Sequence, residues 1–307
     1  MGQRLAARVF DLAVVLAGVS FLVFLLIHLI PGDPVEVMLG ESARAADKAA
    51  LRAALGLDLP LGEQFLRYLD GLARFDLGES LHSRRPVAEL LAERIPATLR
   101  LGGAAFAVAL AVSLPLGVLA AHHHRRWPDR AASLFALFGL SIPNVWLGPL
   151  LILACSSGLG LTPVSGDEGF ASLVLPALTL GLSLAALNTR MVRASLLEVL
   201  HEDYVRTARA KGVSRAAALW RHALPNAALP VLTLLGLQLG SLLAGAVITE
   251  VVFGWPGVGS LLVDAIRQRD YPVVQACVLF VSLVYVLFNA LVDVLYEVVD
   301  PRTRPGT

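Results

Sequence analysis

The sequence predicts an all-α integral membrane protein with six transmembrane helices, both termini in the cytoplasm, and a long first extracytoplasmic loop that contains short helices. Hydrophobic residues make up 56% of the chain and charged residues 16%, and the mean hydropathy is +0.71, a composition typical of lipid-embedded proteins. Uncharged stretches of about 20 residues, the length that crosses a bilayer, occur six times. Arg and Lys gather in alternate connections, as expected for cytoplasmic loops.

The first uncharged stretch has a competing interpretation, because Arg4 and Arg8 precede it as they would precede the core of a signal peptide. Its apolar run is too long for that, and it ends in Ile-Pro-Gly-Asp-Pro rather than in a small-residue cleavage site. We therefore interpret it as the first span. The six predicted spans are residues 12–32, 101–121, 131–157, 171–189, 223–249 and 271–292.

The distribution of positive charge predicts the orientation of the chain. The short loop 156–172 has no Lys or Arg, whereas residues 190–221 contain seven. The long first loop exceeds the length over which this bias operates. Positive charges are therefore expected in the cytoplasm at Arg4, Arg8, Arg125, Arg126 and Arg130, throughout residues 190–221, and at Arg302 and Arg304.

Residues 33–96, between the first two predicted spans, are polar and lack strand periodicity, so we expect short helices there. Residues 42–55 are Ala-rich and helix-prone. A second helix is predicted from Pro86, because proline suits a helix start. It would lie on the membrane surface or pack on the protein's own helices, and both alternatives stay open. Its apolar stripe consists of Val87, Leu90, Leu91 and Ile95.

The loop at residues 190–221 is too rich in helix formers to be a simple tether. Two helices with a break between them are predicted, because Gly212 suits a left-handed helix end and Ser214 suits the cap of the next helix. A helical hairpin that projects from a membrane bundle is expected to contact a partner. The alternative is a solvated basic loop that only sets the orientation of the chain.

The stretch from Arg206 to Pro225 resembles the cytoplasmic coupling loop of permease subunits of binding-protein-dependent ABC importers. The pattern in that family is Glu-Ala-Ala, three residues, Gly, nine residues, then Ile-x-Leu-Pro. The residues that match it are Ala208, Gly212, Leu224 and Pro225. Those that replace the Glu, the first Ala and the Ile are Arg206, Thr207 and His222. These departures are similar to the peptide and nickel branch of the family, whose members resemble this chain at residues 203–212.

Other short motifs similar to that branch are spread along nearly the whole chain. A match of all of them in order by chance is very improbable. They are Ile-Pro-Gly-Asp-Pro at 30–34, Asp-Leu-Gly-Glu-Ser at 76–80, Pro-Ala-Thr-Leu at 96–99, Trp-Pro-Gly-Val-Gly at 255–259, Arg-Asp-Tyr-Pro-Val-Val-Gln at 269–275 and Asp-Pro-Arg at 300–302.

The resemblance implies a non-catalytic subunit of a bacterial inner-membrane importer. Its expected partners are a second, homologous permease subunit, two ATP-binding subunits, an extracytoplasmic substrate-binding protein and membrane lipid. ATP and Mg²⁺ are expected in the ATP-binding subunits and no cofactor in this chain, which lacks a glycine-rich phosphate loop ending in Gly-Lys-Ser/Thr. The residues expected to couple to the ATPase are Asp203, Tyr204, Arg206, Thr207, Ala208, Arg209, Ala210, Lys211, Gly212, Val213, Leu224 and Pro225.

We expect three regions along the chain. Residues 1–96 would hold the first span and the extracytoplasmic loop, and residues 97–298 a core of five spans with the coupling loop at about 190–222. Residues 299–307 would form a cytoplasmic tail. Polar residues inside the spans are candidates for the translocation path, although interhelical hydrogen bonds would explain them as well. They are Asn144, Gln238, Ser241 and Asn289.

Alternative functions differ in what the chain would need. A secondary transporter would use an intramembrane carboxylate or broken helices for ion coupling, and the predicted spans contain no central acidic residue. A membrane protease would need motifs that are not found, such as His-Glu-x-x-His. The net charge of +1 gives no reason to expect nucleic acid as a partner. For the substrate, a small peptide is the first hypothesis, and nickel or a metal chelate is the second. No metal site is expected at His122–His124, because this run lies beside Arg125 and Arg126.

Overall fold

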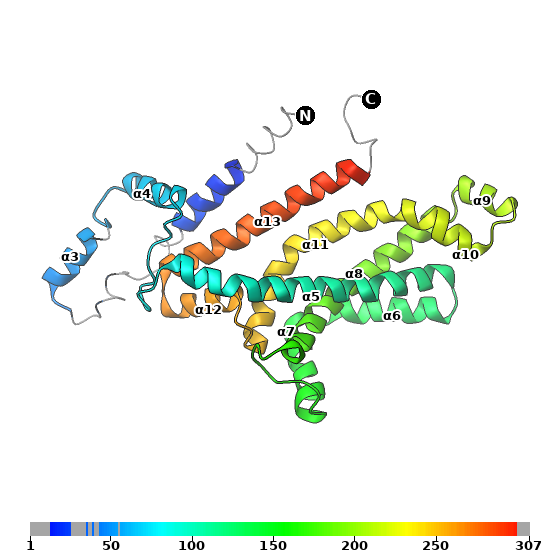
Figure 1. The fold of residues 1–307 in the computed structure, drawn as a ribbon, viewed down its shortest axis with the longest axis horizontal. Helices are drawn as coiled ribbons and strands as arrows, with labels where there is room; N and C mark the ends of the chain where they lie inside the picture. The colour runs from blue at the N-terminus through cyan, green and yellow to red at the C-terminus, as the bar shows by residue number, and fades with distance from the viewer. Residues whose placement is uncertain (1–12, 26–34, 36–38, 40–42, 55, 300–307) are drawn as a thin grey trace, which may run out of the picture. The chain divides into compact units, whose positions relative to one another are not determined.

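The computed structural model describes residues 13–25, 35, 39, 43–54 and 56–299. These residues fold almost entirely into helices, and the only strand-like feature among them is an isolated bridge between Glu79 and Pro86. The expected all-α fold is therefore confirmed (Figure 1). The predicted cytoplasmic tail lies outside the described residues, apart from Val299.

Four described helices are long and apolar enough to cross a membrane, or five if a bent pair counts as one span. They correspond to the predicted spans two, four, five and six. The helices are α5 (Val87–His122), α8 (Phe170–Val199), α11 (Leu224–Phe253) and α13 (Tyr271–Val299). Of the first predicted span, the structure describes the shorter apolar helix Ala13–Leu25, and the remainder lies outside the described residues.

The third predicted span, residues 131–157, is not one straight helix. Helix α6 (Trp127–Ser141) is followed by α7 (Asn144–Leu151) and a π-helical segment (Ile152–Gly158), and the two parts bend by 105°. The break lies at Ile142, which has extended backbone angles of φ −93° and ψ 114°. A residue before proline avoids the helical region because of the proline ring, and Pro143 follows here. The proline at position 143 therefore interrupts the helix within the apolar run of residues 131–157.

The chain divides into two compact units, of which the first comprises residues 1–98 and 256–286. Its described helices include α3 (Ala45–Ala54), which confirms the helix expected at 42–55, and α4 (Leu61–Ala73), which lies in the loop where short helices were expected. Helix α12 (Val258–Gln268) was not predicted. The segment from Pro86 does not form a separate helix, since it continues into the second span as part of α5. Its stripe packs on the protein's own helices, and the buried residues of this core are Val87, Leu91, Val258, Ala265, Val273, Ala276 and Cys277.

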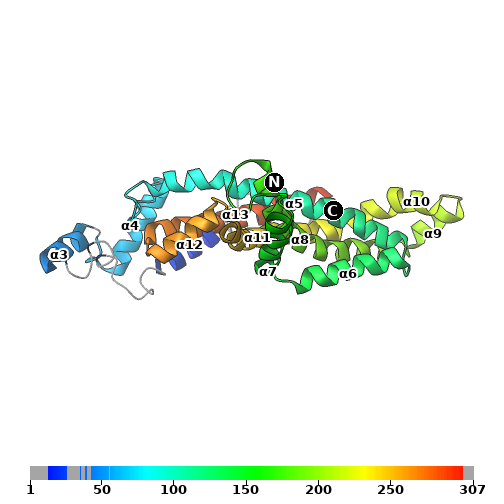
Figure 2. The ribbon, with the colours of Figure 1, turned by 90° about the horizontal axis from the view of Figure 1, so that it is seen from below.

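The second unit comprises residues 99–255 and 287–307. Helix α8 packs between α6 and α11, and both views show it beside α6 (Figures 1 and 2). Small residues permit this close packing: a Cβ on Gly139 would lie only 2.6 Å from the Cβ of Ala186. Helices α9 (Asp203–Ala210) and α10 (Arg215–Ala218) connect the end of α8 to the start of α11.

Candidate functional site

The predicted coupling loop is a helical hairpin, as its sequence pattern indicated. After α8 ends at Val199, α9 begins at Asp203, and α10 runs through a π-helical segment (Leu219–Ala223) directly into α11. The hairpin extends beyond the ends of α8 and α11, away from α7 (Figure 1). It therefore projects from the helices α8 and α11 that it connects.

Helix α9 presents most of its surface to solvent and is held by one apolar contact. Val205 is fully buried. The Thr207 hydroxyl donates to the Asp203 carbonyl at 2.9 Å, and Arg206 pairs with the Asp203 carboxylate at 3.3 Å, with both side chains exposed. Exposed pairs of this kind contribute little to stability. The polar groups of α9 are thus available to another protein.

Gly212 ends α9 in the conformation that its sequence position predicted. Its φ of +90° is a backbone angle that other residues rarely adopt. The Gly212 amide donates to the Arg209 carbonyl at 3.0 Å, and the Val213 amide donates to the Ala208 carbonyl at 3.2 Å. This pair of bonds satisfies the last free carbonyls of a helix that ends in glycine. The glycine of the family pattern therefore sets the direction in which the chain leaves α9.

Ser214 begins the second arm of the hairpin, also as predicted. Its hydroxyl accepts a hydrogen bond from the Ala217 amide at 3.3 Å, as a helix cap does. The second arm is anchored in the protein interior by Ala218, Leu219 and Ala223, which are buried. Other buried residues of the same core are Val118, Ala121, Val192, Leu196, Ala227, Val231 and Leu235.

The last two pattern residues lie at the start of α11 rather than on the hairpin. Pro225 is in the first turn of α11, directly after the π-helical segment. Pro225 is exposed, and Leu224 packs against the core beneath the second arm. Together they fix where the hairpin joins the membrane helix.

A pocket of about 300 Å³ lies between α9 and the ends of α5 and α8. All its polar lining side chains are basic or histidine, and its other walls are Ala121, Leu197 and Leu200. The basic lining residues are His124, His201, Arg206 and Arg209.

Tyr204 also lies on α9. Burial and the nearby Glu202 raise the pKa of the Tyr204 phenol, which stays protonated at neutral pH.

An ion pair that was not predicted from the sequence joins Asp129, in the first turn of α6, to Arg193 of α8. The buried Asp129 accepts two hydrogen bonds from Arg193, one of them at 3.0 Å, and a third from the Arg125 amide at 2.8 Å. His124 lies 3.2 Å from the same carboxylate. A lone acidic residue among Arg125, Arg126 and Arg130 was the signal that could have revealed it.

Three of the four polar residues proposed for the translocation path lie near the α8–α11 packing. Asn144 of α7 accepts a hydrogen bond from Ser183 of α8. The Ser241 hydroxyl donates to the Gln238 carbonyl at 3.0 Å on α11. Gln238 is buried, and its Oε1 has no hydrogen-bond partner among the described residues. Asn289 lies on α13.

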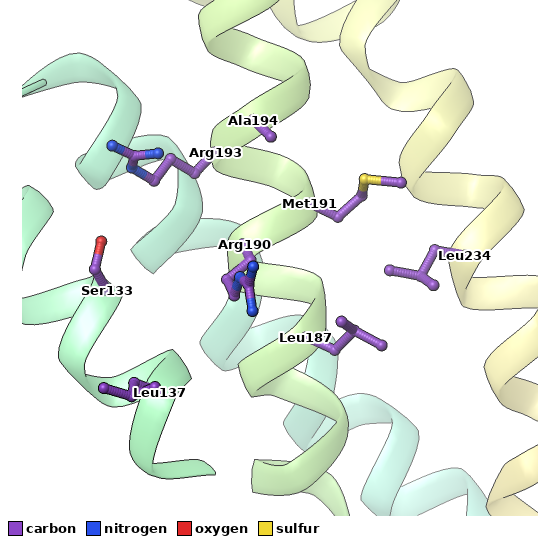
Figure 3. Close-up of a pocket in the computed structure, with 8 residues that line it drawn as sticks. All are labelled: Ser133, Leu137, Leu187, Arg190, Met191, Arg193, Ala194 and Leu234. Atoms are coloured by element: carbon purple, nitrogen blue, oxygen red, sulfur yellow. The ribbon is translucent and has the colours of Figure 1, made fainter. Parts of the chain in front are cut away.

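A second pocket, of about 670 Å³, was not predicted from the sequence. It is lined by α6, α8 and α11, and Figure 3 shows Arg190 of α8 between Leu137 and Leu234. Arg190 directly follows the fourth predicted span, so the sequence suggested only a charge that marks the cytoplasmic end. The remaining lining residues are Ser133, Leu187, Met191, Arg193 and Ala194.

Two protein-family models together match nearly the whole chain. The model described as binding-protein-dependent transport system inner membrane component matches residues 113–305. The model for the N-terminal part of such a membrane component matches residues 1–102.

Among characterised relatives, the glutathione transport system permease protein GsiC of Escherichia coli O6:H1 is 46% identical, with 97% of each chain covered. The dipeptide transport system permease protein DppB of Escherichia coli K12 is also 46% identical, with 94% of each chain covered.

Solved structures share the fold at lower identity. A chain of the inward-facing MetNI methionine ABC transporter gives a TM-score of 0.57 at 22% identity and covers 69% of this chain and 96% of its own. A chain of an amino acid ABC transporter solved with histidines gives a TM-score of 0.54 at 18% identity, with 68% and 94% covered.

Proposed function

The chain belongs to the family of binding-protein-dependent transport system inner membrane components, and on this basis we propose that it forms half of a translocation path for small peptides and couples that path to separate ATPase subunits. It is a multi-pass membrane permease of an ABC importer. The observation that carries the coupling role is the hairpin of α9 and α10, which holds the pattern residues Ala208 and Gly212 on an exposed arm.

Coupling requires an element that contacts the ATPase and transmits its movement to the membrane helices. Helix α9 has an exposed polar face and a single buried anchor at Val205. The second arm continues without interruption into α11 through Leu224. A displacement of α9 as the ATPase dimer closes would therefore act on α11 and, through the Asp129–Arg193 pair, on α6 and α8. Residues 203–213 with Leu224 and Pro225 form this proposed coupling surface.

The remaining expectations about topology follow from the same assignment. We propose six spans with both termini in the cytoplasm, the bent α6–α7 segment being the third. Residues 1–96 would supply the first span and the extracytoplasmic loop, residues 97–298 the permease core, and residues 299–307 a cytoplasmic tail. Asn144, Gln238, Ser241 and Asn289 are proposed to border the path.

The partners are proposed from the family's mode of assembly. A second, homologous permease subunit would complete the path, two ATP-binding subunits would bind the hairpins, and an extracytoplasmic protein would deliver the substrate. ATP and Mg²⁺ would be bound by the ATP-binding subunits, and this chain would carry neither catalytic residues nor a cofactor. ATP-driven import is favoured over secondary transport by the family assignment.

The peptide substrate is proposed from the names of the two relatives, one a glutathione and the other a dipeptide permease. Nickel or a metal chelate was the other hypothesis. Among the described residues, no three His, Cys, Asp or Glu side chains are grouped so that they could hold a metal ion. We propose the peptide as the cargo because of the two relatives' names, and nickel or a metal chelate remains the second hypothesis.

The decisive experiment is purification of the chain with its neighbouring gene products, followed by reconstitution into proteoliposomes. We expect a complex with a second permease and ATP-binding subunits whose ATPase activity rises with peptide-loaded binding protein. ATP-dependent uptake of radiolabelled dialanine or glutathione would identify the cargo. A particle of this chain alone that transports without nucleotide would contradict the proposal, and uptake of Ni²⁺ but no peptide would overturn the substrate.

A further inference from the structure

The pocket of about 670 Å³ around Arg190 combines apolar walls with a few polar groups. Small-molecule sites are commonly about 300–1,000 Å³ in volume, mostly apolar, with a few polar groups that fix orientation. Leu137, Leu187, Met191 and Leu234 supply apolar walls, and Ser133 supplies a hydroxyl (Figure 3).

The two arginines of this pocket differ in what they already bind. Arg193 is neutralised by the buried Asp129 carboxylate, so its guanidinium is occupied. The Arg190 side chain forms no ion pair or hydrogen bond within the described part of the chain. Figure 3 shows the two side chains leaving α8 in different directions, with Arg193 directed toward α6. The pocket therefore holds one guanidinium with all its donors available.

One face of α8 connects Asn144 of the proposed path to this pocket. Ser183, Leu187, Arg190 and Ala194 are spaced by four, three and four residues, so they share one face of the helix. Ser183 binds Asn144 at one end of this face, and Arg190 lies two turns further on.

The facing helix α11 continues the same track. Because a Cβ on Gly245 would contact Leu180, and Leu234 lines the pocket with Met191, α8 and α11 run antiparallel. This register places Gln238 about level with Leu187, one turn along α11 from the pocket wall at Leu234. Polar groups thus follow the boundary between the two helices to the pocket.

We propose that the Arg190 pocket is a holding site for the cargo during import, in which the guanidinium binds the C-terminal carboxylate of the peptide. This inference rests on the proposed function and extends it to a specific residue and a specific group of the substrate. A guanidinium presents two parallel N–H donors that match the two oxygens of a carboxylate. The apolar walls accept side chains of varied shape, and the Ser133 hydroxyl can bond a peptide group.

The test uses the complete transporter in proteoliposomes, with the binding protein and ATP, and measures uptake of radiolabelled dialanine. Arg190→Gln removes the charge, Arg190→Lys keeps it without the paired donors, and Arg130→Gln removes an exposed cation outside the pocket. We expect initial uptake to fall about tenfold or more in Arg190→Gln and less in Arg190→Lys, because a charge-assisted bidentate contact is lost or weakened. Arg130→Gln should behave as the unchanged protein.

ATPase activity without binding protein separates loss of the site from loss of the assembly. It should remain measurable in every variant, which shows that the ATP-binding subunits are still assembled with the permease. If the unchanged transporter imports dialanine and Arg190→Gln imports it equally well, the holding site is refuted while the proposed function stands. Co-purified phospholipid that is lost in Arg190→Gln with unchanged uptake would also refute it, since the anion would then be a lipid phosphate. If the unchanged transporter imports no peptide, the proposed function fails and the inference fails with it.

Discussion

Ser80 donates a hydrogen bond of 2.5 Å to the carboxylate of Asp270, a residue 190 positions later in the chain. Asp270 is 3% exposed and also accepts from the amide of Leu81 at 3.1 Å and that of His82 at 3.4 Å. The Ser80 hydroxyl in turn accepts from the Ser83 amide at 2.9 Å. One carboxylate therefore orders a loop of the first unit that has no helix of its own.

Replacing Asp270 by alanine should loosen this loop. The buried Ser80 hydroxyl and the partly buried amides of Leu81 and His82 would lose their acceptor, at a cost of about 2–4 kcal/mol. We expect faster hydrogen–deuterium exchange at residues 80–85, measured by mass spectrometry on the purified protein. Asp264→Asn is the matched control, because Asp264 is an exposed residue of α12. Equal exchange in Asp270→Ala and in the unchanged protein would contradict the role of this carboxylate.

Replacing Gly212 by leucine should uncouple transport from ATP hydrolysis without preventing insertion into the membrane. Nothing lies within 4 Å of a Cβ at this position, so the strain would come from the backbone angle of +90° alone, about 1–2 kcal/mol. The chain would relieve it by changing the end of α9. ATP-driven uptake is the measurement, and Gly212→Asn is the control because asparagine tolerates positive φ better. Unchanged uptake in the leucine variant would show that this hairpin is not the coupling element.

Asp129→Asn should destabilise the second unit by about 2–3 kcal/mol, because it leaves Arg193 with no charged partner at 29% exposure. The melting temperature in detergent should fall. The control is Asp203→Asn, which breaks the exposed pair with Arg206 and should change the free energy of unfolding by less than about 0.5 kcal/mol. Similar melting temperatures for the two variants would mean that the Asp129 pair contributes no more than a surface pair.

Thr98→Val should weaken the contact between α5 and α12. The Val258 amide, the first of α12, donates to the Thr98 hydroxyl at 2.8 Å, and it would remain buried without an acceptor. The expected loss is about 1–3 kcal/mol, measured as a shift of thermal unfolding. Thr98→Ser keeps the hydroxyl and should stay closer to the unchanged protein. If serine and valine have the same effect, the methyl group rather than the hydrogen bond matters.

Several local features were predictable because neighbouring residues decide them. The glycine at 212 with serine at 214 predicted the break and the cap of the hairpin, and hydropathy located α8, α11 and α13 to within a few residues at most boundaries. The helix break before Pro143 could also have been predicted, since a residue before proline avoids the helical region. It was missed because residues 131–157 are apolar throughout. Helix α12 was missed because it lies in a short, mixed segment between two strong apolar signals.

The sequence by itself determined the membrane class, the positions of most spans, the hairpin and the family, since these depend on composition, on local backbone preference and on motif spacing. Only the tertiary structure decided which polar groups meet: Ser80 with Asp270, Asp129 with Arg193, and Ser183 with Asn144. It also showed that Arg190 lies in a pocket. The physical reason is that a buried polar group must find its partner wherever packing places one, and that partner is commonly far away along the chain.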